Sequence, residues 1–175
     1  MKTYKISEEE AAKLLQKNSW TSVIVGQRNV LETIKKLSWK PNIIHCMGWF
    51  AALLPFYVKR TEYKNHPFFS DSKIVISLFN DEFQGSLVES FIKKLKMEGG
   101  TAKDWKNYKE PTYLNIMKAA ISYSEAVVVA QEGVNPELIE FAIANKKQVI
   151  DFAPFDEQKE KINNLYDSLA VIDEE

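Results

Sequence analysis

Short apolar segments alternate with segments of helical pattern along this chain, and no other feature constrains the fold as strongly. The apolar segments are rich in β-branched side chains and lie at residues 43–46, 74–79, 126–130 and 149–152. Short strands separated by helices are typical of βαβ units, whose strands form a parallel sheet. The sequence therefore predicts an α/β fold, a Rossmann-like three-layer sandwich with a mostly parallel sheet covered on both faces.

The expected helices follow from apolar spacing and from residues that start or stop a helix. Leu87, Phe91 and Leu95 recur at four-residue steps, and Asn135 followed by proline is typical of a first turn. Pro55 is expected to kink its helix or to begin a new first turn. The expected helices cover residues 7–16, 30–39, 50–59, 86–96, 112–124, 135–144 and 158–169. A weak strand is expected at 21–25, a polar loop at 61–72 and an irregular segment at 101–111.

Bulk composition excludes several classes of protein. A chain of 175 residues with 45% hydrophobic and 27% charged residues is ordinary for one globular domain. The formal net charge of −1 argues against a nucleic-acid partner, because such binding normally needs a basic excess. Acidic and basic residues are interspersed, so no polybasic patch indicates a membrane surface.

Targeting signals and metal-binding patterns are also missing from the sequence. The N-terminal residues are too polar for a signal peptide and no apolar stretch reaches membrane-spanning length, so we expect a cytoplasmic protein. Cys46 is the only cysteine and the chain has two histidines, which argues against a disulfide and a zinc site. No Gly-rich phosphate loop is present, and we expect neither a metal nor a cofactor.

Polar loops follow the first two of these predicted strands. Gly48 and Trp49 come just after the first strand, and Asn80, Gln84 and Gly85 come after the second. In an open α/β sheet, ligands bind outside the carboxyl ends of the strands. We therefore expect both loops to lie on one functional edge of the sheet.

Four motifs, in this order, resemble the N-terminal catalytic domain of bacterial glycogen and starch synthases. Residues 45–49 read His-Cys-Met-Gly-Trp and precede Ala-Leu-Leu-Pro, where the family has His-x-His-Asp-Trp or His-Cys-His-Gly-Trp. Residues 79–85 are similar to the family's His-Asn-x-x-Tyr/Phe-Gln-Gly. Residues 115–125 resemble its Asn-Phe-Leu-Lys-Ala-Gly-Ile-x-Tyr-Ala-Asp. The Asn-Pro-Glu-Leu-Ile-Glu of residues 135–140 is typical of a short Bacteroidetes-type form.

The resemblance implies one half of a two-domain glycosyltransferase of the GT-B architecture. Such an enzyme moves glucose from a nucleotide sugar similar to ADP-glucose onto the end of an α-1,4-glucan. We expect residues 27–172 to form the Rossmann-like domain, with an N-terminal helical lead-in at 1–26 and a short tail at 173–175.

Several family features are absent, which bears on activity. Met47 and Phe79 replace family histidines, and Gln131-Glu132 replace a Ser-Pro pair. The Lys-x-Gly-Gly-Leu loop and the second domain, which supply positive charge around the nucleotide diphosphate, have no counterpart here. We therefore expect a domain that is incomplete and inactive alone, unless a second chain supplies the missing half. The alternatives are a non-catalytic protein that binds α-glucan or regulates a synthase, and a Rossmann-like module unrelated to sugars.

The first motif offers three candidate binding residues. His45 is expected at the end of its strand, either hydrogen-bonding sugar hydroxyls or buried and tied to the next loop. Gly48 permits a tight turn or close approach of a ligand to the backbone. Trp49 is either a core anchor beneath the loop or a platform on which a sugar stacks.

The second and third motifs supply amides and a cation. Asn80 and Gln84 have side-chain donors and acceptors that match sugar hydroxyls, although Asn80 is equally suited to capping its loop. Gly85 completes the second motif. Asn115 and Lys118 share one helix face and would contact donor, acceptor or phosphate, or else form an ordinary solvent-facing pair.

Acidic residues near the second loop invite a glycosidase hypothesis. Asp71, Asp81 and Glu82 are the carboxylates concerned. Glycoside hydrolysis needs two carboxyl groups flanking one bond, and nothing in the sequence fixes such a separation. We therefore expect these residues to lie in a solvated loop.

Overall fold

A computed structural model describes residues 27–87 and 90–170, and it contains one parallel sheet. The four strands lie side by side in the order in which they occur along the chain. They are β1 (Ile43–Met47), β2 (Lys73–Leu78), β3 (Ala126–Val129) and β4 (Gln148–Ile150). In the register of the pairs, His45 lies opposite Val75, and Ile76 lies opposite Val127. The predicted parallel, Rossmann-like α/β sheet is therefore confirmed.

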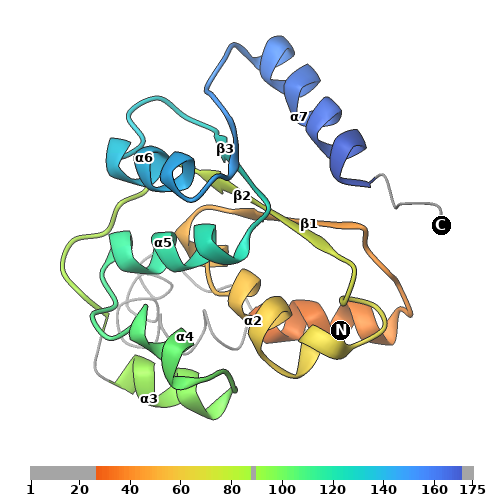
Figure 1. The fold of residues 1–175 in the computed structure, drawn as a ribbon, viewed down its shortest axis with the longest axis vertical. Coiled ribbons are helices and arrows are strands. Elements are labelled where there is room, and N and C mark those ends of the chain that lie inside the picture. Colours follow the sequence, from red (N-terminus) through yellow and green to blue (C-terminus); the bar gives the residue numbers. More distant parts are fainter. Residues whose placement is uncertain (1–26, 88–89, 171–175) are drawn as a thin grey trace, which may run out of the picture.

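The strand order determines which face each helix covers. Every strand is added on the same side of the previous one, and right-handed crossovers then place the connecting helices on one face of the sheet. These helices include α2 (Leu54–Arg60), α5 (Tyr113–Tyr123) and α6 (Pro136–Ala144). The last helix, α7 (Phe155–Ala170), lies on the opposite side of the strands (Figure 1). It packs Leu165 against Val75, Ala126 and Val128.

Polar side chains cap the first turns of two helices, and the cap at Asn135 was predicted from the sequence. Thr112 caps α5, because its Oγ1 accepts a hydrogen bond from the Asn115 N–H at 3.3 Å. Asn135 caps α6, with its Oδ1 3.0 Å from the Glu137 nitrogen. The segment predicted as one helix at 50–59 is instead a 3₁₀ turn at Trp49–Ala51 followed by α2, with Pro55 in the first turn of α2.

Two segments predicted to be irregular contain helical turns. The 101–111 segment contains α4 (Ala102–Lys106), which begins with a capping box formed by Thr101 and Asp104. The 61–72 segment contains a 3₁₀ turn at Glu62–Asn65, and its aromatic residues Tyr63 and Phe69 are fully buried. Both predictions were wrong because tertiary packing of aromatic side chains orders segments whose local composition is polar.

The helix predicted at 86–96 begins later than its apolar spacing suggests. It is α3 (Ser90–Met97). Ser86 instead pairs with Thr112 in an isolated β-bridge, and the Leu87 N–H donates to the Pro111 carbonyl. The helix and the strand expected at 7–16 and 21–25 lie outside the described residues.

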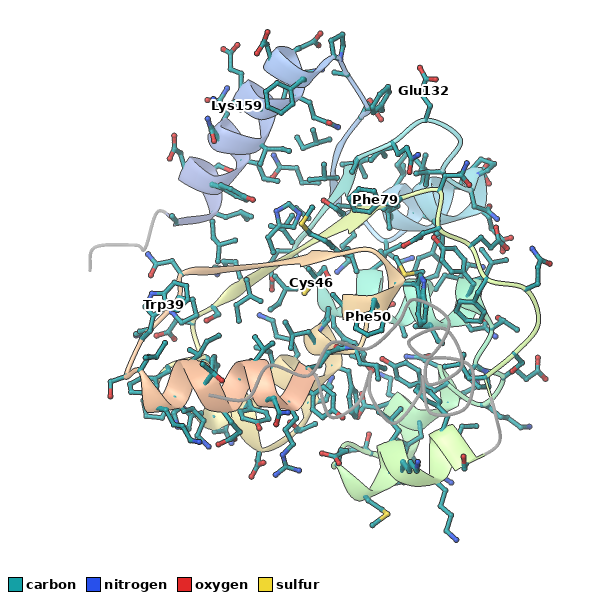
Figure 2. All side chains as sticks on the ribbon, turned by 180° about the vertical axis from the view of Figure 1, so that it is seen from behind. Trp39, Cys46, Phe50, Phe79, Glu132 and Lys159 are labelled. Carbon is teal, nitrogen blue, oxygen red and sulfur yellow. The ribbon has the colours of Figure 1, made fainter. Side chains whose placement is uncertain are left out.

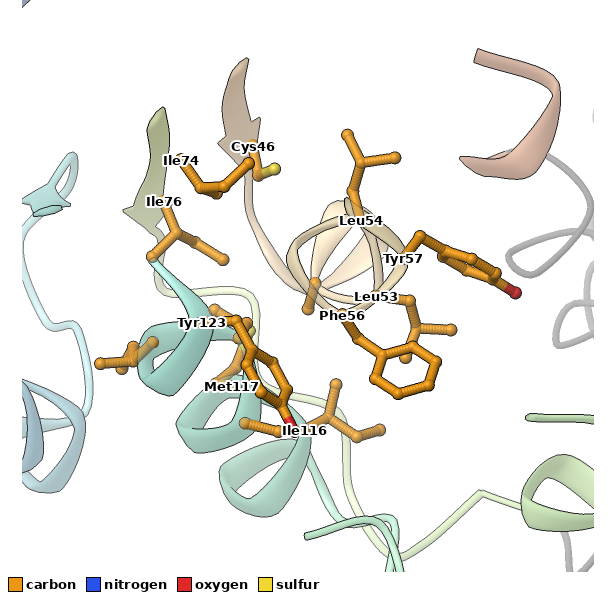
Figure 3. Close-up of a cluster of buried hydrophobic side chains, with 14 of the residues drawn as sticks. Cys46, Leu53, Leu54, Phe56, Tyr57, Ile74, Ile76, Ile116, Met117 and Tyr123 are labelled. Carbon is orange, nitrogen blue, oxygen red and sulfur yellow. The ribbon is translucent and has the colours of Figure 1, made fainter. Parts of the chain in front are cut away.

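The main core lies between the sheet and the helices α2 and α5 (Figure 3). Phe56 is completely buried, and its ring contacts Tyr108 and Tyr123 at centroid distances of 5.7 and 6.2 Å. The side chains labelled around it are Cys46, Leu53, Leu54, Tyr57, Ile74, Ile76, Ile116, Met117 and Tyr123. The single cysteine is thus a buried core residue.

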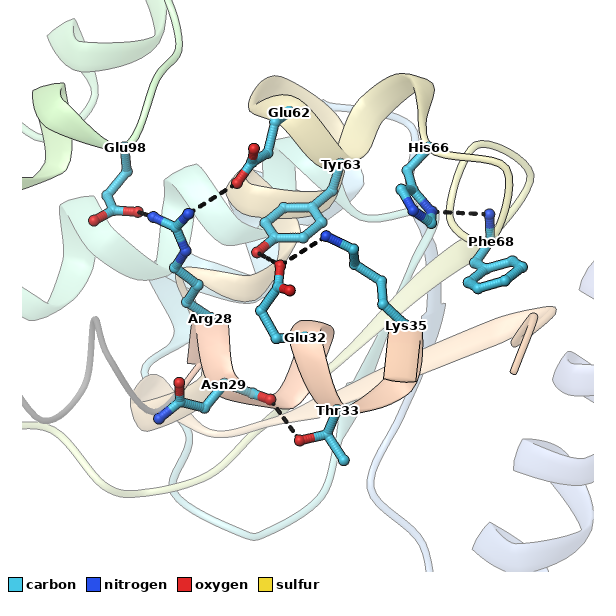
Figure 4. Close-up of polar contacts among 10 residues, drawn as sticks. All are labelled: Arg28, Asn29, Glu32, Thr33, Lys35, Glu62, Tyr63, His66, Phe68 and Glu98. Atoms are coloured by element: carbon cyan, nitrogen blue, oxygen red, sulfur yellow. Dashed lines mark hydrogen bonds and ion pairs between the residues drawn. The ribbon is translucent and has the colours of Figure 1, made fainter. Parts of the chain in front are cut away.

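A polar network fastens the helix at residues 27–36 to its neighbours (Figure 4). Arg28 pairs with Glu62 at 3.0 Å and with Glu98 at 2.8 Å. Glu32 accepts hydrogen bonds from Tyr63 at 2.7 Å and Lys35 at 3.0 Å. Exposed ion pairs contribute little individually, so the network mainly orients this helix against the 3₁₀ turn and α3.

Candidate functional site at the carboxyl edge of the sheet

One carboxylate joins the loops that follow β1 and β2. Asp81 Oδ2 accepts a hydrogen bond from the Trp49 N–H at 3.2 Å, and its Oδ1 accepts one from the Tyr113 hydroxyl at 2.9 Å. The same hydroxyl lies 3.3 Å from the Phe79 carbonyl oxygen. Asp81 is half-buried and links both loops to the start of α5, so the prediction of a merely solvated loop was wrong for this residue.

Gly48 has a backbone conformation that only glycine adopts readily. Its φ is 66° and its ψ is −177°, and its N–H donates to the Ser77 carbonyl at 3.0 Å. A Cβ at this position would lie 2.5 Å from Asp81 Oδ2. The missing side chain therefore leaves the space that the Asp81 carboxylate occupies.

Aromatic rings support the joined loops. Trp49 packs against the main core, and its ring meets Phe83 edge-on at a centroid distance of 5.0 Å. Phe83 in turn contacts Tyr113 at 5.8 Å. Around this cluster, Met47 and Phe50 are exposed by 61% and 48%, and Figure 2 shows where Phe50 and Phe79 lie along this edge. The result is a half-buried aromatic layer beneath a partly apolar rim.

The loop after β3 is held beside the loop after β2. The Asn80 N–H donates to Gln131 Oε1 at 3.2 Å, and Asn135 Nδ2 lies 3.3 Å from Glu82 Oε2. A Cβ on Gly133 would lie 2.9 Å from Asn80 Nδ2. Gln131 and Gly133 were not among the predicted site residues, although their position directly after a strand is the signal that could have found them.

Gln84 and Gly85 form the exposed outer end of the second loop. Gly85 has a φ of 80°, and a Cβ there would meet nothing within 4 Å. The Gln84 side chain is exposed and has no hydrogen bond to any described residue. Both positions are therefore open to an incoming molecule.

His45 lies away from this edge. It sits in the middle of β1, because the strand continues to Met47, so the expected position at the strand end was wrong. Its Nδ1 is 2.5 Å from the Tyr166 hydroxyl and its Nε2 is 2.7 Å from Ser77 Oγ. The ring therefore ties β1 to β2 and to α7, on the opposite face of the sheet from the main core.

His45 should make stability depend on pH. Burial lowers the pKa of His45, so the folded protein keeps the ring neutral at a pH where the unfolded chain binds a proton. The contribution of the neutral ring to the free energy of unfolding is complete at pH values above the ordinary histidine pKa of about 6.5. It is lost as the pH falls toward the lower pKa of His45 in the folded protein. Urea unfolding at pH 7.5 and 5.5 should show that acidification lowers the free energy of unfolding less in His45→Asn than in the wild type. An equal loss in both proteins would contradict the assignment.

Asn115 and Lys118 share one face of α5, as their spacing predicts, but have structural partners. Asn115 Nδ2 donates to the Glu110 carbonyl at 2.7 Å. Lys118 pairs with Glu137 at 2.5 Å, and its ammonium lies 5.6 Å from the centre of the Phe141 ring. They line a pocket of about 250 Å³ that shares no residue with the loops after β1, β2 and β3. The structure thus does not bring them together with the other candidates.

Residues 11–148 match the family described as the starch synthase catalytic domain. The chain belongs to this family. It is 37% identical over 124 residues to a glycogen synthase of Pelodictyon phaeoclathratiforme. This match covers 70% of this chain and 25% of that protein. It is also 44% identical over 82 residues to a glycogen synthase of Chlorobium limicola, and this match covers 47% of this chain and 17% of that protein. A glycogen synthase of Clostridium perfringens is 34% identical over 107 residues, which are 60% of this chain and 22% of that protein. No solved structure matches the chain.

Membership of the starch synthase catalytic domain family excludes one of the earlier alternatives. It makes the chain a glycogen/starch synthase-like glycosyltransferase domain and excludes an unrelated Rossmann-like module. The chain nevertheless spans only about a quarter of these relatives, or less. Among the described residues, no group of acidic, histidine and cysteine side chains is placed to hold a metal ion, and no helix is long and apolar enough to cross a bilayer.

Proposed function

We propose that the carboxyl edge of this domain binds the substrates of a glucosyl transfer, a nucleotide sugar similar to ADP-glucose and an α-1,4-glucan. The observation that carries the proposal is the tie made by Asp81, which brings the family's first two motifs together at the end of β1 and β2. Residues 27–172 form the domain in this proposal, and the binding surface consists of Gly48, Trp49, Asn80, Gln84 and Gly85.

Each of these residues has a feature suited to sugar recognition. The Asn80 and Gln84 amides are exposed and can both donate to and accept from hydroxyl groups. Trp49 offers an aromatic surface, which stacks well on the apolar face of a sugar ring. Gly48 and Gly85 allow the ligand to approach the backbone closely. His45 acts in this scheme as a positioning residue for β1 rather than as a sugar ligand.

Glucosyl transfer itself needs positively charged side chains, which the described residues of these loops do not supply. A nucleotide sugar releases a nucleoside diphosphate, and positively charged side chains stabilise such a leaving group. Among the residues that the structure describes, the charged side chains of the loops after β1, β2 and β3 are Asp81, Glu82 and Glu132, all acidic. We therefore propose that the cations come from another part of a synthase, either in the same polypeptide or in a second chain.

An NMR titration of the whole chain tests the proposed edge. Maltoheptaose at millimolar concentration is expected to shift the Trp49, Asn80 and Gln84 amides, while the β-linked cellohexaose should not. ADP-glucose is expected to shift residues of the same loops. Gln84→Ala should weaken glucan binding by about tenfold, because it removes one side chain that hydrogen-bonds the sugar.

The control variant is Gln148→Ala, since Gln148 is also exposed but lies at the start of β4, at the other end of the sheet. It should bind maltoheptaose like the wild type. If neither ligand moves any of these resonances, direct substrate binding by this edge is wrong.

A further inference from the structure

A second pocket lies at the end of the sheet opposite the carboxyl edge. Its volume is about 340 Å³, and it opens between the C-terminal ends of α2 and α5. Four cations line it together with a single carboxylate, namely Lys59, Arg60, Lys64, Lys147 and Glu125. None of its residues belongs to the loops after β1, β2 and β3, so it is separate from the edge proposed to bind sugar.

Carboxylates compensate only two of these four cations. Lys59 pairs with Glu125 at 3.0 Å, and Arg60 pairs with Asp104, just outside the pocket, at 3.2 Å. The second Glu125 oxygen is occupied by the Ile74 N–H at 2.5 Å. Within the described part of the chain, Lys147 and Lys64 have no carboxylate at ion-pair distance. The pocket therefore carries an excess of positive charge.

The C-terminal ends of two helices offset part of this positive charge, but not all of it. The Lys147 ammonium donates to the carbonyls of Ser122 and Ser124, at 3.1 and 2.7 Å, and so satisfies the end of α5. Each helix C-terminus carries a partial charge of roughly −0.5, so the ends of α2 and α5 together offset about one cation. Counting only the described residues, one of the four cations remains uncompensated.

The surroundings of Lys147 favour an anion. Burial lowers the pKa of Lys147, Glu125 opposes this effect, and the nearby Lys59 charge lowers the pKa further. Lys147 has one N–H left after its two carbonyl bonds, since an ammonium has three donors. The Lys64 side chain is exposed at the pocket, and its ammonium has no hydrogen-bond or ion-pair partner among the described residues.

We propose that this pocket binds a small oxyanion, either inorganic phosphate or the phosphate group of a small monoester. Lys147 and Lys64 would donate to it, and Lys59 and Arg60 would add attraction while keeping their own carboxylate partners. The volume is at the lower end of the range for small-molecule sites, which suits a phosphate with a short organic group.

Calorimetric and NMR titrations of the full chain at constant ionic strength test this proposal. Inorganic phosphate and glycerol 3-phosphate are titrated separately, with chloride as the ionic-strength control. Phosphate is expected to shift the amides of Ser124 and Lys147. Lys64→Gln should weaken binding about tenfold, the usual loss for one charge-assisted hydrogen bond. This variant removes no side-chain hydrogen bond or ion pair to a described residue, so its folding should be unaffected.

The matched control is Lys159→Gln, on the exposed side of α7 (Figure 2). It should bind phosphate like the wild type, and both variants should bind maltoheptaose normally. Tighter binding of glycerol 3-phosphate would identify a monoester as the ligand, whereas equal binding would identify phosphate itself. The proposal is overturned if phosphate acts no differently from chloride, if its shifts lie elsewhere, or if Lys64→Gln binds like Lys159→Gln.

Discussion

Gly48→Ala is expected to destabilise the protein by about 2–4 kcal/mol and to weaken glucan binding at least tenfold. The backbone at Gly48 has φ 66° and ψ −177°, a conformation that costs any other residue strain. The new methyl would also lie 2.5 Å from the Asp81 carboxylate, which must then move. Displacing Asp81 would release both the Trp49 N–H and the Tyr113 hydroxyl, and with them the geometry of the proposed binding edge.

Urea unfolding and a maltoheptaose titration measure these two effects. For the loss of stability, Gly85→Ala is the matched control, because Gly85 also has a positive φ but open space around it, so this variant should cost only about 1 kcal/mol. Gly48→Ala should also be less costly in an Asp81→Ala background, where the clash is absent. If Gly48→Ala and Gly85→Ala lower the free energy of unfolding equally, the contact between residue 48 and Asp81 does not affect stability.

Phe56→Ala is expected to lower the free energy of unfolding by about 3–5 kcal/mol, through lost apolar burial and the cavity left behind. Phe56 is completely buried and lies between Tyr57, Tyr108 and Tyr123, all within ring-contact distance. It also packs against Gly100, where a Cβ would lie 2.9 Å from its ring. The loss should appear as a lower midpoint in urea with a similar slope.

Phe155→Ala provides the comparison for Phe56→Ala. Phe155 begins α7 and is 79% exposed, so its removal should change the unfolding free energy by no more than about 0.5 kcal/mol. A loss below about 1.5 kcal/mol for Phe56→Ala would mean that the core around α2 and α5 is not packed as described.

Much of the fold follows from local sequence patterns. The four apolar segments became the four strands, with bounds that differ by at most two residues at either end. Thr112 and Asn135 cap helices as their chemistry predicts, because capping depends on neighbours within a few residues. The segment with α4 was missed, since its order rests partly on the distant contact between Asp104 and Tyr123.

The candidate site was less predictable than the fold. The position of the loops at one edge follows from parallel strands, but the contact between Gly48 and Asp81 joins loops that follow different strands. His45 lies on the opposite face of β1 from Ile44 and Cys46, because side chains alternate along a strand, but only the structure shows that these two neighbours face the main core. Its partner Tyr166, 121 positions away, was not visible in any local pattern.

The sequence by itself determined the parallel α/β class, the strand positions, the cap at Asn135 and the resemblance to the synthase family, because each depends on local periodicity or on contiguous motifs. Only the tertiary structure decided that Asp81 organises the carboxyl edge, that Asn115 and Lys118 lie apart from it, and that cations gather at the opposite end. Those features arise from side chains brought together by the sheet order. Contacts of this kind depend on packing between distant segments, which no spacing along the chain encodes.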